Sequence, residues 1–142
     1  MILMREYKAY VDGSYRDGLC GYGIVIVDQD DNVVIELYGD VCDNFNMHNV
    51  TGELKAAEHA ILWAYKGNSK VTIYHDYEGI GAWATGKWKA RKLGTVAYRS
   101  FVLKHRDHIG GFVKVKGHSG DIYNQMADEL ATRGIEEALE SC

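Results

Sequence analysis

The fold is decided by residues 7–38, which read YKAYVDGSYRDGLCGYGIVIVDQDDNVVIELY. Apolar runs at residues 7–11, 21–27 and 33–38 predict three strands. The first run is broken by polar residues and glycine, in Asp12-Gly13-Ser14. A tight polar turn joins the second run to the third. Because consecutive strands with short connections pair with opposite directions, this stretch predicts an antiparallel meander.

Helices and further strands follow the meander. Residues 39–50 have no clean period and are interpreted as loop or as the end of a strand, and helical spacing then predicts a helix at 51–65. The remaining predicted elements are a strand at 71–75, two weaker helices at 78–83 and 95–108, a strand at 112–115 after the break at Gly110-Gly111, and a helix at 122–139 capped by Asp121. This order predicts one α/β domain, residues 1–142, with a mixed sheet: the antiparallel meander, then parallel strands reached through helices.

The charge of the chain is unevenly distributed. The 142 residues carry a net charge of −4, yet residues 86–117 hold nine basic side chains against the single acid Asp107. Such a segment favours a polyanion as partner, because lysine and arginine clusters release counterions from phosphates. The alternative interpretation is a solvated helix face without a specific role.

Other features of the sequence exclude whole classes of protein. The longest aliphatic run, residues 24–27, is far shorter than a membrane span, and residues 1–8 lack the pattern of a secretory signal. Cys20, Cys42 and Cys142 show no metal-binding spacing and are interpreted as free thiols. We expect a cytoplasmic protein without membrane contact, and nothing in the sequence indicates an obligate dimer, so a monomer is expected.

Four acids are candidates for chemistry. Asp12 and Asp76 each follow a predicted strand, Glu53 lies in the first turn of the first helix, and Asp128 lies about two turns into the last. If they converge, they need a compensating cation. Oxygen ligands without cysteine or a histidine pair favour Mg²⁺ or Mn²⁺. Taken singly, the strand-end acids are ordinary turn formers, Glu53 a helix-dipole acid and Asp128 an exposed helix residue.

His118 lies in the glycine-flanked loop 117–120, ten residues before Asp128. A mobile imidazole can transfer protons near neutral pH. The alternative is an ordinary surface histidine.

Five segments together resemble the type 1 ribonuclease H family, and specifically its catalytic domain. They occur in the family's order and spacing and extend over nearly the whole chain: YVDGS at 10–14, HNVTGEL at 48–54, IYHDY at 73–77, GHSG at 117–120 and NQMADELA at 124–131. The resemblance implies the ribonuclease H fold, a five-stranded mixed sheet flanked by helices.

The resemblance also implies an activity and its residues. Asp12, Glu53, Asp76 and Asp128 match the family's catalytic carboxylates, and His118 matches its mobile active-site histidine. The implied reaction is endonucleolytic cleavage of the RNA strand of an RNA/DNA hybrid, leaving a 5′-phosphate and a 3′-hydroxyl. The implied cofactor is a pair of Mg²⁺ ions, for which Mn²⁺ can substitute.

Hybrid contacts follow from the same resemblance. The amide of Asn49 matches a position that reaches the minor groove, with a helix cap as its alternative role, and Ser14 and Ser119 are candidates for binding backbone phosphate. Four residues, Trp83, Lys87, Trp88 and Lys89, resemble the element that lies along the DNA strand, with one tryptophan expected in the core. The short segment between Trp88 and Tyr98 implies a reduced basic protrusion. A silent hybrid-binding module and an exonuclease or integrase on the same fold are the competing hypotheses.

Overall fold

The computed structural model describes residues 3–116 and 121–141, and its centre is a five-stranded sheet of order β3-β2-β1-β4-β5. The meander is antiparallel, whereas β4 pairs in parallel with β1 and β5 pairs in parallel with β4. The mixed sheet predicted from the order of the elements is therefore confirmed. The strands are β1 Glu6–Arg16, β2 Leu19–Val27, β3 Val33–Cys42, β4 Lys70–His75 and β5 Ile109–Lys114.

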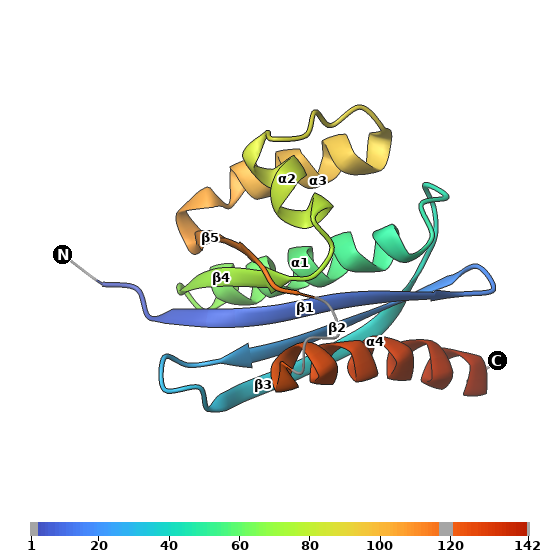
Figure 1. Cartoon of the computed structure of the whole chain (residues 1–142), viewed down its shortest axis with the longest axis horizontal. Coiled ribbons are helices and arrows are strands. Elements are labelled where there is room, and N and C mark those ends of the chain that lie inside the picture. Colours follow the sequence, from blue (N-terminus) through green and yellow to red (C-terminus); the bar gives the residue numbers. More distant parts are fainter. Residues whose placement is uncertain (1–2, 117–120, 142) are drawn as a thin grey trace.

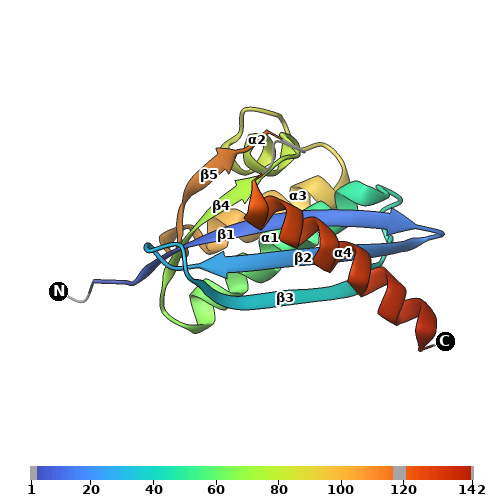
Figure 2. The same ribbon diagram turned by 60° about the horizontal axis from the view of Figure 1, so that its bottom comes forward.

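Helices cover both faces of the sheet. Three helices, α1, α2 and α3, lie on one face, and α4 lies alone on the other (Figure 1). In a second view α4 crosses β1, β2 and β3 (Figure 2). A larger apolar core lies beneath α1 and a smaller one beneath α4. None of the described helices is both long enough and apolar enough to cross a membrane. The helices are α1 Asn49–Lys66, α2 Gly79–Thr85, α3 Leu93–Lys104 and α4 Ile122–Glu140, with a 3₁₀ turn, Arg106–His108, before β5.

The first strand is longer than the sequence suggests. It passes through Asp12 and ends at Arg16, so the prediction that Asp12 ends its strand is wrong. Polar Asp12 and Ser14 stay in the strand because their backbones pair with Gly23 and Gly21 of β2. The hairpin closes through Asp17-Gly18, both at positive φ, which is the sequence signature of a tight hairpin turn.

Glycines let two helices approach the sheet closely. A Cβ on Gly13 would overlap the backbone of Gly52 and Glu53 in α1, and a Cβ on Gly52 would overlap the Gly21 carbonyl oxygen. On the other face, a Cβ on Gly23 would overlap the Ala127 carbonyl oxygen in α4. The missing side chains therefore set the height of α1 and α4 above β1 and β2.

The start of α1 is organised by Asp43, after β3 has ended at Cys42. Asp43 accepts hydrogen bonds from the amides of Met47 and His48, at 2.8 Å each, and from the Thr51 hydroxyl at 2.6 Å. His48, at φ 57°, precedes the helix, and Asn49 is its first residue. The cap role weighed for Asn49 is thus not what the structure shows.

A second difference concerns the glycine pair 110–111. The predicted helix 95–108 ends as α3 at Lys104, followed by the 3₁₀ turn, and both glycines lie inside β5. The pairing of β4 with β5 shifts between Val71 and Thr72, and this irregularity skips Gly110. The glycines therefore accommodate a bulge in a strand instead of breaking a helix.

Two predictions on single residues are confirmed. Asp121 caps α4 by accepting from the amides of Tyr123 and Asn124, at 3.0 and 3.1 Å. Cys20 and Cys42 are free thiols, the first buried and the second exposed. Cys142 lies outside the described residues.

Candidate active site

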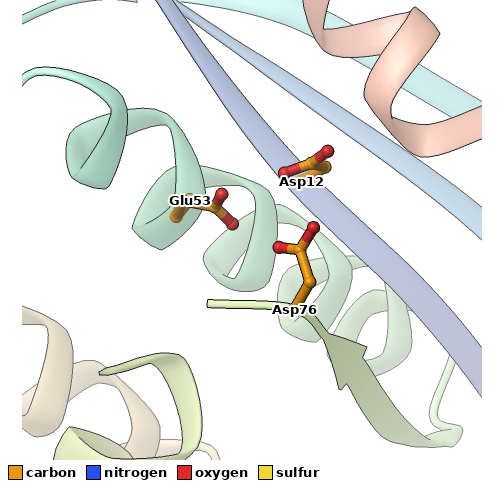
Figure 3. Close-up of side chains that lie close together, drawn as sticks. All are labelled: Asp12, Glu53 and Asp76. Carbon is orange, nitrogen blue, oxygen red and sulfur yellow. The ribbon is translucent and has the colours of Figure 1, made fainter. Parts of the chain in front are cut away.

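Three carboxylates converge where β4 ends. Asp12 comes from β1, Glu53 from α1 and Asp76 from the residue after β4, and their side chains point toward one another (Figure 3). One oxygen of each lies within 4.8 Å of one oxygen of the other two. Asp12 and Glu53 are only 6% and 4% exposed, whereas Asp76 is partly exposed. We call these residues the carboxylate cluster.

The sheet register and the glycine contacts build this cluster. Val11 pairs with His75 between the parallel strands β1 and β4, so the next residue of each chain segment is an acid, Asp12 and Asp76. Glu53 follows Gly52, the residue that α1 presses against the sheet. The close contact of the α1 backbone with the sheet therefore positions the third acid.

Burial makes Asp12 and Glu53 reluctant to ionise. It raises the pKa of Asp12 to about 7, with a further contribution from the charge of Asp76, while a hydrogen bond with Glu53 acts in the opposite direction. The pKa of Glu53 is raised even though the Gly13 amide lowers it, because burial and the neighbouring charge of Asp12 dominate. Repulsion between these carboxylates is thus built into the folded chain.

The cluster fits a divalent cation. Glu53 Oε2 is buried and has no hydrogen-bond partner in the described part of the chain. No ion pair between described residues uses an acid of the cluster. Carboxylate oxygens suit hard cations such as Mg²⁺, and a bound cation offsets both the repulsion and the unpaired oxygen.

Asp128 lies apart from the cluster. It projects from α4 as an exposed residue and is not among the three acids whose oxygens lie within 4.8 Å of one another. Its charge nevertheless contributes to the raised pKa of Asp12. The structure therefore brings three of the four predicted acids into contact and leaves the fourth within electrostatic range.

The other predicted residues have varied positions. Ser14 is half-buried in β1 and pairs with Gly21, and Asn49 is exposed at the start of α1. His118 and Ser119 lie outside the described residues.

The aromatic and basic residues lie around α2. Trp83 packs against the core, whereas Trp88 is 36% exposed, and their rings meet edge to face with centroids 5.5 Å apart. Lys87 Nζ lies 3.1 Å from Glu78 Oε1, and Lys89 is exposed. The expectation that one tryptophan belongs to the core is met only in part, because Trp83 is partly buried and packs against the core from outside.

A cavity of about 430 Å³ joins this region to the start of α1. Tyr77 and Trp83 form aromatic walls, and Lys89, Arg91 and Lys92 supply positive charge. Sequence reasoning did not single out Tyr77, Arg91 or Lys92 as site residues. The sequence does contain features that could have identified them. Tyr77 directly follows Asp76, and both cations belong to the basic run KWKARK at 87–92.

Comparison with known proteins gives concordant matches. The RNase H family model matches residues 4–136. A ribonuclease H of Francisella tularensis subsp. novicida is 33% identical, with 92% of this chain and 91% of the relative aligned. A ribonuclease H of Neorickettsia sennetsu is 28% identical, with 92% and 93% aligned.

Solved structures share the fold. RNase H1 from Halobacterium salinarum superposes with a TM-score of 0.77 at 19% identity, covering 93% of this chain and 98% of the other. LC11-RNase H1, isolated from compost and solved in complex with an RNA/DNA hybrid, superposes with a TM-score of 0.79 at 22% identity, covering 94% and 99%.

Proposed function

This chain belongs to the ribonuclease H family, and on that premise we propose that it hydrolyses the RNA strand of RNA/DNA hybrids at the carboxylate cluster. The products are a 5′-phosphate and a 3′-hydroxyl end. One observation carries the proposal: Asp12, Glu53 and Asp76 come from separate elements and place one oxygen each within 4.8 Å of the others. A purely structural protein gains nothing from burying repelling acids together.

The cofactor in this proposal is a pair of Mg²⁺ ions, replaceable by Mn²⁺. Asp12, Glu53 and Asp76 would hold these ions together with Asp128 from α4. Bound divalent cations supply a water of lowered pKa and positive charge beside the reacting phosphate. Asp12 and Glu53 are buried, so a bound cation would stabilise their ionised forms, which burial otherwise disfavours. His118 assists proton transfer or product departure.

Substrate contacts come from two sides of the cluster. Asn49 reaches the minor groove, where the 2′-hydroxyl distinguishes RNA from DNA, and Ser14 and Ser119 bind backbone phosphate. Lys87, Trp88 and Lys89 hold the DNA strand. Trp83 supports Trp88 through the edge-to-face contact of their rings. The edge-to-face contact of the two tryptophans and the three cations of the neighbouring cavity support this arrangement.

The wider setting follows the sequence-based expectations. We propose that residues 1–142 act as one catalytic domain, as a monomer and in the cytoplasm.

Cleavage of a labelled RNA strand paired with DNA tests the function. The same assay is run with single-stranded RNA, RNA duplex and DNA duplex, each with Mg²⁺, with Mn²⁺ and with a chelator. We expect metal-dependent internal cuts in the hybrid alone. Hybrid binding without cleavage would indicate a silent binding module, and preference for a free 3′ end would indicate an exonuclease.

Substitution of one cluster acid provides the matching variant. Asp76→Asn removes a metal-binding charge with little change of shape, so we expect a folded protein, judged by circular dichroism, without measurable hydrolysis. Near-normal cleavage by this variant would rule out the proposed site.

A further inference from the structure

A second buried oxygen without a partner lies in α4. Asn124 is 5% exposed, and its Oδ1 accepts no hydrogen bond from the described residues. Glu53 Oε2, in the carboxylate cluster, is the other such side-chain atom in the described part of the chain. An unpaired buried acceptor destabilises a fold, because its hydration is lost without replacement. Asn124 therefore needs a donor from outside these residues.

The contacts of its neighbours locate Asn124 over β1. Tyr123 stacks obliquely on Tyr10, with ring centroids 5.2 Å apart. Ala127 packs against Gly23, which pairs with Asp12. Asn124 lies between these two contacts along α4, so its side chain faces the part of β1 that leads into Asp12.

The same helix places Asn124 beside Asp128. Residues four apart are neighbours on a helix, and Asp128 lies four positions after Asn124. Asp128 in turn acts electrostatically on Asp12. Asn124 is therefore a helix neighbour of one acid that is proposed to bind metal, and that acid acts on a second.

We propose that Asn124 is a positioning residue that accepts a hydrogen bond from a water held by the divalent cation at Asp12 and Asp128. This inference rests on the proposed function. A water is the donor that fits, because a side chain 95% buried leaves no room for a nucleotide, and waters of hydration are strong donors. Asn124 fixes the hydration of the cation without binding it directly.

A purely structural Asn124 has different consequences. If it stabilised the start of α4, its removal would lower the stability of the metal-free protein and leave cation affinity unchanged. In the role proposed, removal of the unpaired acceptor leaves the metal-free protein equally stable or more stable and weakens cation binding. Only in the second case does cation affinity fall without a loss of metal-free stability.

The test compares Asn124→Leu and Asn124→Ala, which lack the acceptor, with Asn124→Asp, which keeps it. Gln125→Leu, at an exposed position of the same helix turn, is the control. Mn²⁺ alone is titrated without substrate and the free ion is followed by electron paramagnetic resonance, while Tm is measured in chelator. We expect about a tenfold weaker Mn²⁺ affinity for the Leu and Ala variants with an undiminished metal-free Tm. Asn124→Asp and Gln125→Leu should retain affinity within about threefold of the parent chain.

Two results would overturn the inference. A lower metal-free Tm with unchanged Mn²⁺ affinity in both acceptor-free variants makes Asn124 a structural residue and leaves the proposed function intact. If the parent chain itself binds no Mn²⁺, the proposed function fails, and the role of Asn124 fails with it. The two Asn124 variants keep the test decisive if one of them does not fold.

Discussion

The two helices that carry the proposed metal-binding acids approach the sheet from opposite faces, and they hold those acids differently. On one face, α1 presses Gly52 against β1 and β2, and Glu53 is 4% exposed. On the other, α4 approaches Gly23 just as closely, yet Asp128 remains exposed. Close packing of a helix therefore does not decide whether its acid is buried. What differs is the residue that makes the contact. The Cβ position on Gly13 lies against the amide nitrogen of Glu53 itself, whereas the Cβ position on Gly23 lies against Ala127, one residue before Asp128.

Exchanging each acid for its amide tests this difference with the largest expected effect. Glu53→Gln should lower the cleavage rate on the order of a thousandfold, because it removes a carboxylate that would hold the metal ion beside the reacting phosphate. It should also raise the metal-free Tm at pH 8, since a buried repelling charge is lost. Asp128→Asn should reduce cleavage less and leave the metal-free Tm unchanged. Equal metal-free Tm values for the two variants would contradict the comparison.

The pH dependence of stability in the metal-free protein is expected to distinguish the buried Asp12 from the exposed Asp128. Asp12 has a pKa of about 7 in the folded chain and an ordinary value near 3.8. A raised pKa stabilises the fold below the ordinary value, and that contribution is lost as pH rises through about 7, so Asp12 should account for a loss of at most about 4 kcal/mol of stability in chelator between pH 4 and 8. The raised pKa of Glu53 adds a loss of the same sign. Urea unfolding across this range measures the total. Asp12→Asn should reduce the loss more than Asp128→Asn does.

Alanine substitutions at the glycines that contact α1 and α4 should have a smaller effect on stability. They also test the comparison of the two helices. Gly13→Ala and Gly23→Ala each force a Cβ against helix backbone and should cost about 1–3 kcal/mol of unfolding free energy. Only Gly13→Ala displaces Glu53, so it should weaken Mn²⁺ binding more than Gly23→Ala does. Isothermal titration of both variants checks this order, and the reverse order would contradict it.

The smallest expected effect lies at the start of α4. The Tyr123 hydroxyl donates to the Asp31 carbonyl oxygen at 2.5 Å and so ties α4 to the turn between β2 and β3. Tyr123→Phe should lower the unfolding free energy by about 1 kcal/mol. Chemical denaturation measures it, with the cleavage rate as a second readout. A loss above about 3 kcal/mol would mean that the helix start is held by this bond alone.

Much of the fold could be predicted from hydrophobic pattern. The runs at 21–27 and 33–38 have few polar interruptions, and the helix at 122–139 carries a recognisable cap in Asp121, so these elements match the structure closely. Polar residues inside a strand were the main source of error. Asp12-Gly13-Ser14 looks like a break, because its pairing with Gly21 and Gly23 is a long-range property that local pattern does not contain.

The candidate site was predictable to a different degree. Asp76 could be chosen from its position after a strand, Glu53 from its position at a helix start, and all three acids from the family resemblance, although Asp12 lies inside its strand and not after it. Their burial could not, because it depends on the contact of Gly13 with Gly52 across 39 positions of sequence. The unpaired oxygen of Asn124 is likewise invisible in the sequence, where it is one residue of a helical motif.

The contact between Gly52 and Gly21 also matters to anyone who wishes to make this enzyme more robust. Replacing helical glycine by alanine is a standard route to stabilisation, since it removes freedom from the unfolded chain. Here Gly52 in α1 and Gly134 in α4 both lie against strand backbone that cannot move aside. Gly94 in α3 faces the flexible side chain of Met47 instead. Engineering by this route should therefore begin at Gly94 and leave the other two untouched.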